Sequence, residues 1–414
     1  MHIRDSKRKC VLLIIDGLGD LPVAELGGRT PLEAASTPVL DQLASEGRYG
    51  LVDPVAPGVI PNTHSGCGML FGVFPGETGH LKRGPVEASG AGRLLSPGEI
   101  AFRANFATFE EVDHGFCIRD RRAGRISSGT AELASSVGEV DLGDGVFASL
   151  QPTDQHRCVL VLSGPGLNPE VSDTDPGDGK EPLELLDCRP LAPGAEATAN
   201  KVNAFIAHAH RVLRSHPINI GRQQAGKLPA NGVLTRGAGA AFTLDNVLSS
   251  RGIKAAVVVG CNTVRGMARI LGFEAVSEAG FTADAGTDLE AKMAAALRAL
   301  EKNDLAYLHI KAPDLFSHDR QPLAKRDFVE RLDKAIASLR EAGVMIALTA
   351  DHTTDSNTGA HTADPVPTLL YQPGSADRQA TDPVNFGEQA CREGNLPRQR
   401  SHDFLLDVVS RMGF

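Results

Sequence analysis

Three features are missing from this sequence, and each absence argues against a class of protein. The seven cysteines include no CxxC pair, which argues against a disulfide framework and favours reduced thiols. The apolar run Val11–Ile15 is too short for a signal peptide or a membrane span. A basic surplus is also missing, because the formal net charge is −9, so bulk attraction favours no nucleic acid partner. We therefore expect a soluble, cytoplasmic protein that binds neither nucleic acid nor membrane.

The composition is that of an ordinary globular enzyme. With 414 residues, of which 42% are hydrophobic and 22% charged, the chain is long enough for two domains or one domain with an insertion. Buried-type strands at Cys10–Ile15, Ala255–Val259 and Leu305–Ile310 alternate with amphipathic helical segments. This alternation predicts an α/β fold with a doubly wound, mostly parallel sheet. We expect a core made of residues 1–92 and 226–414.

Residues 93–225 have a different pattern and predict an inserted domain. Ile100–Phe109 alternates like a strand, and Gly115–Ile118 is its expected partner. Ala195–Leu213 has helical spacing. We therefore expect this insertion to be an α+β domain.

Ligand-type side chains follow the apolar run Val344–Ala350. The run ends in Asp351-His352, and a glycine-containing loop leads on to His361. In open α/β sheets, ligands bind beyond the carboxyl ends of the strands. Carboxylate and imidazole groups at that edge are typical ligands of ions such as Zn²⁺ and Mn²⁺. A hydrated Asp-His pair that caps a strand is the structural alternative.

Similar side chains follow two other strands. Asp314 and His318 come after Leu305–Ile310, and their spacing of four places both on one face of a helix. Asp16 follows Cys10–Ile15 directly. Residues 57–68 have the composition of a loop. Within them, Thr63 supplies a hydroxyl near the N-terminus of an expected helix, where backbone N–H groups favour a phosphate.

Two metal-ligand sets follow from these positions. They are Asp314, His318 and His361 for one ion, and Asp16, Asp351, His352 and the Thr63 oxygen for the other. A two-metal site suits in-line phosphoryl displacement, and a threonine hydroxyl needs such activation to act as a nucleophile. Each residue also has a structural alternative: Asp16 in a turn, Thr63 or Asp314 as a helix cap, His318 on the surface. Their occurrence together at several strand ends favours the functional interpretation.

Sequence blocks along nearly the whole chain carry a family resemblance. The blocks are Ile15–Gly17, Leu26–Ala35, Phe102–Thr108, Asp120–Arg125, His156-Arg157, Arg236–Gly239, His309–Ala312, Asp351-His352 with His361, and Asp364–Pro367. On these residues the sequence resembles the archaeal-type, cofactor-independent phosphoglycerate mutases of the alkaline phosphatase superfamily. The resemblance implies an alkaline phosphatase-like core with a substrate-binding cap, two divalent ions (Mn²⁺, Mg²⁺ or Zn²⁺) in the two ligand sets, a phosphoenzyme at Thr63, and interconversion of 2- and 3-phosphoglycerate.

A substrate of this class is a small phosphorylated carboxylic acid, and arginine recognises both of its anionic groups bidentately. The candidate substrate-binding residues are Arg103, Asp120, Arg121, His156, Arg157, Arg236 and Arg265. Arg125 as a solvated surface charge and Arg122 as an internal salt-bridge partner are structural alternatives.

The sequence departs from the family pattern at the nucleophile. The family typically has serine there, an acidic residue next and a histidine four positions after the serine, whereas this chain has Thr63, His64 and Cys67. Ser65 is the alternative nucleophile. Arg265 also stands where a lysine is usual. Threonine serves as nucleophile in phosphodiesterases and phosphonate hydrolases of the superfamily.

Three hypotheses therefore remain open. The first is a phosphoglycerate mutase. The second is a paralogous metal-dependent phosphatase, phosphodiesterase or phosphonate hydrolase that acts on another small phosphorylated metabolite. The third is a non-catalytic, metal-bearing protein that binds such a metabolite. The sequence leaves the identity of the metals and the oligomeric state open.

Overall fold

The computed structural model describes residues 8–78, 81–113, 115–177, 182–375 and 384–414. The chain divides into two compact units. We call Met1–Leu81 with Leu244–Phe414 the core unit, and Lys82–Thr243 the inserted unit. The predicted insertion, 93–225, lies within the inserted unit, which is longer at both ends. It is longer because helix α4 (Arg83–Gly90) and strand β9 (Gly232–Ala240) both contact strand β3 (Glu99–Val112).

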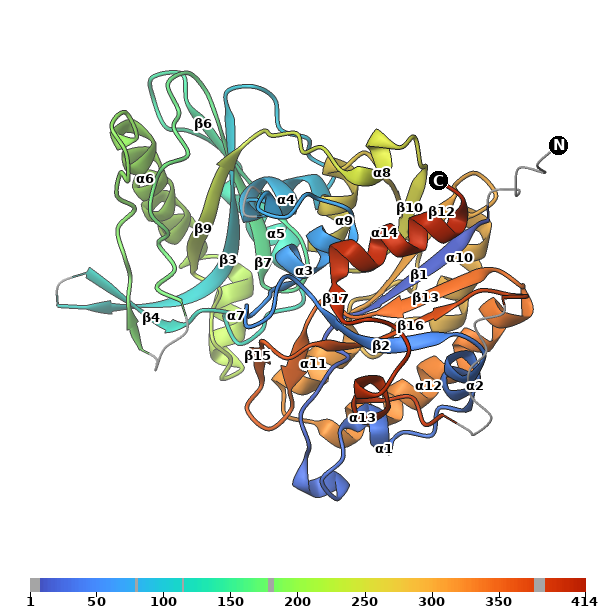
Figure 1. The fold of residues 1–414 in the computed structure, drawn as a ribbon. Coiled ribbons are helices and arrows are strands. Elements are labelled where there is room, and N and C mark those ends of the chain that lie inside the picture. Colours follow the sequence, from blue (N-terminus) through green and yellow to red (C-terminus); the bar gives the residue numbers. More distant parts are fainter. Residues whose placement is uncertain (1–7, 79–80, 114, 178–181, 376–383) are drawn as a thin grey trace. The chain divides into compact units, whose positions relative to one another are not determined.

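In the described part of the core unit, eight strands form one mixed sheet (Figure 1). Their order is β11-β10-β12-β1-β13-β16-β2-β17. The strands are β1 (Cys10–Ile15), β2 (Arg48–Asp53), β10 (Ala255–Val258), β11 (Glu274–Val276), β12 (Leu305–Ile310), β13 (Met345–Thr349), β16 (Val366–Tyr371) and β17 (Gln399–Arg400). Only β16 runs antiparallel to its neighbours among these described strands. The predicted mostly parallel α/β sheet is confirmed.

Helices cover both faces of this sheet. As a result, every residue of β1, β12 and β13 is buried. Long helix α12 contacts α1, α2, α10 and α11, whereas α3 contacts α9 and α14. The helices of the core unit are α1 (Pro31–Ala34), α2 (Pro38–Glu46), α3 (Thr63–Leu70), α8 (Val247–Ser250), α9 (Asn262–Ile270), α10 (Leu289–Ala299), α11 (Ala312–His318), α12 (Pro322–Glu341), α13 (Glu388–Arg392) and α14 (Ser401–Met412), with a 3₁₀ turn at Ala24–Leu26. A small hairpin, β14 (Thr353–Asp355) with β15 (Ala360–Thr362), follows β13.

The strand register fixes where the candidate site forms. Ile15 pairs with Ile310 of β12, and Ile14 pairs with Thr349 of β13. Because these three strands are parallel, the residues that follow them leave the sheet at one edge. Asp16, Lys311 and Asp351 are among those residues.

One local expectation is wrong. Residues 57–68 were expected to form a loop from their composition, but α3 begins at Thr63. The side chain of Asn62 caps this helix by accepting from the N–H groups of His64 and Ser65, and the Ser65 hydroxyl accepts from the Asn62 N–H. This capping box offsets the low helix propensity of the glycine- and threonine-containing segment.

The inserted unit is built on an antiparallel sheet. Its central strand β3 pairs with β4 (Gly115–Asp120), β7 (Arg157–Ser163) and β9, and the sheet continues through β6 (Phe147–Pro152) to β5 (Glu139–Asp141) and through β4 to β8 (Leu183–Glu184). The other helices are α5 (Thr130–Val137), α6 (Glu196–Leu213) and α7 (Pro217–Gln224). The buried side chains of Phe102, Phe106 and Phe205 belong to the hydrophobic core of this unit. The predicted pairing of the strands near residues 100–109 and 115–118 is confirmed.

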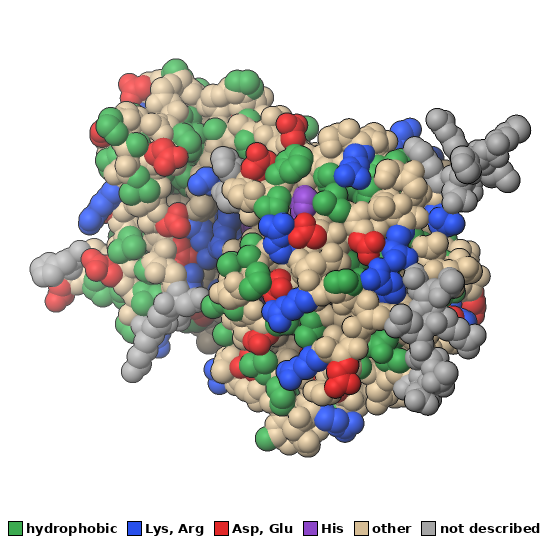
Figure 2. Space-filling model, viewed as in Figure 1, with side chains coloured by type: hydrophobic (Ala, Val, Ile, Leu, Met, Phe, Trp, Pro, Cys, Tyr) green, Lys and Arg blue, Asp and Glu red, His purple; other side chains and the backbone are tan. Residues whose placement is uncertain are grey.

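Among the described residues, no helix combines the length and the hydropathy that a membrane crossing requires. On the face drawn in Figure 2, hydrophobic side chains lie scattered among charged and polar ones.

Candidate active site

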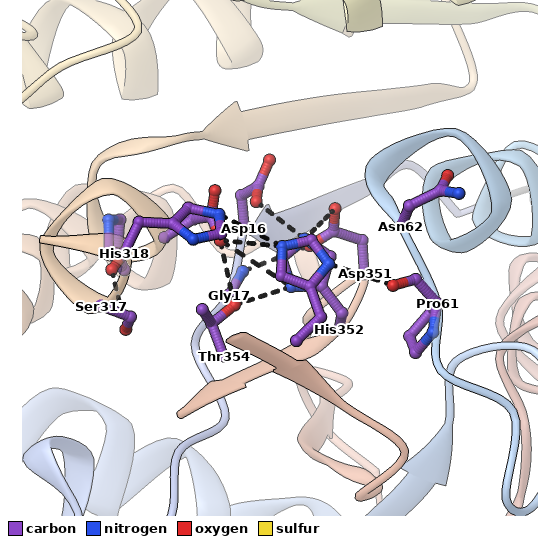
Figure 3. Close-up of polar contacts among 12 residues, drawn as sticks. Asp16, Gly17, Pro61, Asn62, Ser317, His318, Asp351, His352 and Thr354 are labelled. Atoms are coloured by element: carbon purple, nitrogen blue, oxygen red, sulfur yellow. Dashed lines mark hydrogen bonds and ion pairs between the residues drawn. The ribbon is translucent and has the colours of Figure 1, made fainter. Parts of the chain in front are cut away.

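Three buried carboxylates of the core unit meet at the carboxyl edge of the sheet. Asp16 follows β1 directly, Asp351 lies two residues beyond β13, and Asp314 lies in the first turn of α11. All three side chains are almost completely excluded from solvent. Figure 3 shows Asp16, Asp351 and His352 pointing toward one another. Unpaired carboxylates are rare in such an environment, so their charges require nearby cations.

The first predicted ligand set comes together around Asp314. Its Oδ1 lies 3.3 Å from Nε2 of His318 and 3.5 Å from Nε2 of His361, and the two Nε2 atoms are 3.3 Å apart. The other ring nitrogens lie against backbone carbonyls: Nδ1 of His318 is 2.8 Å from Gly359 O, and Nδ1 of His361 is 3.0 Å from Pro61 O. Such contacts orient a ligating imidazole. The three donor atoms therefore converge on one point.

The second set surrounds His352. Its Nε2 lies 3.3 Å from Asp16 Oδ1 and 3.4 Å from Asp351 Oδ2, and its Nδ1 lies 2.9 Å from Thr354 Oγ1. The Thr354 hydroxyl donates to Asp314 Oδ1 at 2.9 Å. The donor atoms of Asp16, Asp314 and His352 all lie within 4.8 Å of one another. Asp314 is thus close to both sets, although we expected it in only one.

The donor chemistry fits divalent metal ions. Nitrogen and carboxylate oxygen donors in both groups match those that Zn²⁺ and Mn²⁺ take. Nε2 of His352 is buried, and although it lies close to oxygens of Asp16 and Asp351, it makes no hydrogen bond of acceptable geometry to any described residue. A buried polar atom of this kind costs free energy unless a ligand satisfies it, and a cation would do so.

Lys311, which sequence analysis did not single out as a site residue, provides a cation between two of the carboxylates. Its Nζ donates to Asp16 Oδ1 at 2.9 Å and also to Asp314 Oδ2. Burial lowers the pKa of the ammonium, but the charges of Asp16 and Asp314 outweigh burial and raise it. Conversely, burial raises the pKa of both carboxyls, but the charge of Lys311 and hydrogen bonds from neighbouring histidines together outweigh burial and lower it. The carboxylates of Asp16 and Asp314 are therefore ionised and can bind cations.

His309 is a second residue that was not predicted. Its buried ring lies with Nε2 at 3.0 Å from Asp16 Oδ2. Asp16 thereby has partners on both oxygens, since Lys311 occupies the other. This fixes the orientation of the Asp16 carboxylate.

Thr63 is the first residue of α3, and helical spacing predicts that it shares a face with the two residues of this helix that approach Asp351. Gly66 and Cys67 share this face, three and four residues on. A Cβ on Gly66 would lie 2.0 Å from Asp351 O, so only glycine allows so close an approach. The Cys67 thiol donates to Asp351 Oδ2 at 3.7 Å. The helix is therefore packed directly on the segment that carries a candidate metal ligand.

The alternative nucleophile, Ser65, is engaged in the cap of α3. Its hydroxyl donates to Asn62 O at 3.1 Å and accepts from Asn62 N at 3.0 Å. The Asn62 side chain in turn accepts from the N–H groups of His64 and Ser65. Two of the first helical N–H groups are thus already bonded, so the helix end offers a phosphate fewer donors than we expected.

In the inserted unit, several predicted arginines form a cluster on adjacent strands. Arg103 of β3 pairs in register with Arg236 of β9, and Arg157 of β7 lies opposite Asn105, two residues along β3. Burial lowers the pKa of Arg103 to about 9; Glu87 partly opposes this, and the charges of Arg157, Arg236 and Arg83 reinforce it. Nε of Arg103 and Nε of Arg236 are buried without hydrogen-bond partners among the described residues. Buried, like-charged donors of this kind favour an anion.

The other predicted substrate-binding residues have different surroundings. Arg121 makes a bidentate ion pair with Asp175 at 2.6 and 2.9 Å, and Asp120 accepts from the backbone N–H groups of Arg122 and Gly124. The Asp120 and Arg121 side chains thus have partners within the unit. Arg265 lies on α9 of the core unit, where it donates to Asn262 Oδ1.

His156 adjoins the arginine cluster as an uncharged ring. Burial lowers its pKa to about 3, and the neighbouring guanidinium groups, Arg157 first, add to the effect. Its Nδ1 is buried without a hydrogen-bond partner among the described residues. A neutral imidazole there could donate or accept one hydrogen bond without adding charge.

Comparisons with known proteins identify the family. A family profile described as 2,3-bisphosphoglycerate-independent phosphoglycerate mutase matches residues 44–219. A protein of that name from Methanopyrus kandleri is 38% identical over 408 residues, covering 96% of this chain and 95% of the relative. The chain belongs to the 2,3-bisphosphoglycerate-independent phosphoglycerate mutase family.

Solved structures agree with this assignment to the phosphoglycerate mutase family. A cofactor-independent phosphoglycerate mutase from Thermoplasma acidophilum matches with a TM-score of 0.67 at 31% identity, covering 98% of this chain and 100% of that chain. A protein from Pyrococcus horikoshii matches with a TM-score of 0.79, also at 31% identity, covering 99% of this chain and 98% of that chain. The similarity extends over both units, so the inserted unit is part of the family fold.

Residues that were not predicted include Lys311 and His309 beside the carboxylates of the core unit, and Arg83 of the inserted unit. Lys311 and His309 stand in the block His309–Ala312, which supported only the family resemblance. The strand-end rule, that ligands bind beyond the carboxyl ends of the strands, identified Asp16 and applied equally to Lys311. Arg83 begins α4, which lay outside the expected bounds of the insertion. Burial lowers the pKa values of Arg103 and Arg236, and the charge of Arg83 adds to this effect.

Proposed function

We propose that this chain interconverts 2-phosphoglycerate and 3-phosphoglycerate through a phosphothreonine formed at Thr63. Full-length relatives carry the name of that activity. The observation that supports the chemistry is the convergence of three carboxylates and three imidazoles beside the Thr63 face of α3. This arrangement suits a reaction in which negative charge develops on a transferring phosphoryl group.

Two divalent ions, Mn²⁺, Mg²⁺ or Zn²⁺, are part of this proposal. Asp314, His318 and His361 would hold one ion, and Asp16, Asp351, His352 and the Thr63 oxygen would hold the other. Bound there, the ions would lower the pKa of the threonine hydroxyl and neutralise charge on the phosphoryl oxygens. Lys311 would remain as a third cation, positioned by Asp16 and Asp314.

The chain's own residues would divide the remaining work. The Thr63 oxygen would attack the phosphorus of the substrate, release glycerate and return the phosphoryl group to the other hydroxyl. In the inserted unit, Arg103, Arg157 and Arg236 would bind the anionic groups of the substrate, with neutral His156 beside them. Asp120 and Arg121 would shape this region through their internal contacts.

A second candidate is hydrolysis of another small phosphate or phosphonate ester. It is favoured by the departures at Thr63, His64 and Cys67, because the family pattern has a histidine where this chain has a thiol. Burial, together with the charges of Asp351 and Asp16, raises the pKa of Cys67 well above its usual value. This thiol is a poor proton shuttle at neutral pH.

One assay separates the two candidates. The purified protein is incubated with 3-phosphoglycerate and Mn²⁺, and 2-phosphoglycerate and free phosphate are both measured. We expect 2-phosphoglycerate, retained activity in Thr63→Ser and none in Thr63→Ala. Free phosphate without 2-phosphoglycerate would favour the hydrolase, and neither product with any divalent ion would rule out the mutase.

A further inference from the structure

A second buried polar cluster lies in the core unit, and the proposed chemistry does not use it. Its centre is Lys325 of α12, whose side chain is fully excluded from solvent. The ammonium donates to Asp20 Oδ2 at 2.7 Å, to Ser317 Oγ at 2.9 Å and to Gly19 O at 3.4 Å. Ser356 completes the cluster, because its N–H donates to Asp20 Oδ1 at 2.9 Å and its hydroxyl donates to Asp20 Oδ2.

The residues of this cluster belong to the three segments that carry the candidate metal ligands. Gly19 and Asp20 lie in the turn that begins at Asp16. Ser317 lies on α11 between Asp314 and His318. Ser356 lies just beyond the segment that carries Asp351, His352 and Thr354. The ammonium group therefore bonds two of these segments directly and reaches the third through Asp20, which accepts from Ser356.

These segments are also bonded directly to one another beside the cluster. Gly19 forms an isolated parallel β-bridge with Thr353, and the N–H of Thr354 donates to Gly19 O at 3.0 Å. A Cβ on Gly19 would lie 2.3 Å from Thr353 Oγ1, so the turn requires glycine for this approach. Thr354 then donates to Asp314. A continuous set of hydrogen bonds thus runs from Lys325 to the ligand atoms.

We propose that Lys325 is a positioning residue that aligns the ligand segments for two divalent ions. The proposal rests on the metal centre of the proposed function. Lys325 suits this task because Asp20 neutralises it, so it adds no net charge near the bound ions. Lys325 also lies on α12, which carries none of the candidate metal ligands. Outer contacts of this kind typically change metal affinity by about 10–100-fold.

Mn²⁺ binding to the purified protein tests the proposal, with titration calorimetry for affinity and electron paramagnetic resonance for coupling between the two ions. The test variant combines Lys325→Met with Asp20→Asn, because removing both charges avoids leaving one buried ion unpaired. We expect about 10–100-fold weaker Mn²⁺ binding and an altered spectrum of the ion pair. Ser317→Ala removes one hydroxyl with little change in volume, and it should weaken binding in the same direction but less.

Asp333→Asn is the matched control. Asp333 is buried on the same helix, α12, but its carboxylate accepts from the N–H groups of Val39 and Leu40 at the start of α2. This variant should lose stability while it keeps the wild-type Mn²⁺ affinity and spectrum. Weaker Mn²⁺ binding in the control equal to that in the double variant would overturn the proposal, because loss of stability alone would then explain both.

The remaining outcomes separate this inference from the proposed function. If wild type binds two Mn²⁺ ions and the double variant and Ser317→Ala bind them equally well, Lys325 has no positioning role. If wild type binds no Mn²⁺, the metal centre of the proposed function fails and the inference fails with it. If the double variant does not fold, Ser317→Ala decides: unchanged affinity overturns the inference and weakened affinity supports it.

Discussion

The candidate site of the core unit and the arginine cluster of the inserted unit are opposite in charge and are assembled differently. In the core, parallel strands bring Asp16, Asp314 and Asp351 to one edge, with Lys311 between two of them. In the inserted unit, antiparallel neighbours bring Arg103 and Arg236 together. Each set carries an excess of one charge in a buried place. The comparison indicates that the core is built to hold cations and the inserted unit to hold an anion.

The largest expected effect comes from Asp314→Asn, because this carboxylate lies close to both ligand sets. We expect both Mn²⁺ sites to be lost and turnover to fall by at least about 1,000-fold, since each bound ion supplies several kcal/mol of charge stabilisation. Titration calorimetry and the mutase assay measure the two effects. Asp355→Asn, at a buried carboxylate that binds the following turn, is the control. Retained Mn²⁺ affinity in Asp314→Asn would contradict the assignment of a cation site.

A partly buried carboxyl of the core, Glu388, offers a second comparison, because it accepts from Asp20 N–H and the Thr30 hydroxyl rather than from a lysine. Burial raises its pKa from 4.5 to about 7. The native state therefore binds the Glu388 proton more tightly than the unfolded state does. The resulting contribution to stability is present in full below pH 4.5 and is lost as the pH rises through about 7. Relative to Glu388→Gln, the wild-type free energy of unfolding should fall by about 3 kcal/mol across that range. Denaturant unfolding at several pH values measures it, and a constant difference would contradict the raised pKa of Glu388.

Arg103→Gln tests the other half of the comparison. Loss of one buried, charge-assisted donor should raise KM for the phosphoglycerate by about 10–100-fold and leave Mn²⁺ affinity unchanged. Steady-state kinetics and Mn²⁺ titration separate these effects. Arg119→Gln is the control, because Arg119 is an exposed arginine of the same unit that pairs with Glu110. Equal KM values for the two variants would argue against anion binding by the cluster.

Asp120→Ala should have the smallest effect. Its carboxylate accepts two backbone N–H groups in the turn that follows β4, so its removal should cost about 1–2 kcal/mol of stability. KM should change by less than about twofold, because we assign Asp120 to the turn rather than to the substrate. Thermal unfolding and steady-state kinetics measure both. A large rise in KM without loss of stability would return Asp120 to the substrate-binding set.

The fold of the core was predictable because its strands are uninterrupted apolar runs. The strand-end rule then selected Asp16, Asp314 and Asp351, since parallel strands bring their carboxyl ends together whatever the strand order. Lys311 was missed because a lysine after a strand resembles a solvated residue, and its role depends on Asp16 and Asp314 meeting in space. The bounds of the inserted unit were misplaced because α4 and β9 join it through contacts with β3.

Long-range pairing explains the remaining differences in the inserted unit. Arg121 stays a predicted substrate ligand, but the structure adds an ion pair to Asp175, which is 54 residues away. No local pattern indicates that partner. Arg103 was easier to predict, because an arginine inside an apolar strand needs a specific reason to be there.

Mapping the phosphorylated residue tests the central claim most directly. The protein is mixed with 3-phosphoglycerate and Mn²⁺, quenched within milliseconds and digested, and its peptides are analysed by mass spectrometry. We predict a phosphoryl group on Thr63 that is absent from Thr63→Ala. A phosphoryl group on Ser65 instead, or 2-phosphoglycerate formed while Thr63 stays unmodified, would contradict the account.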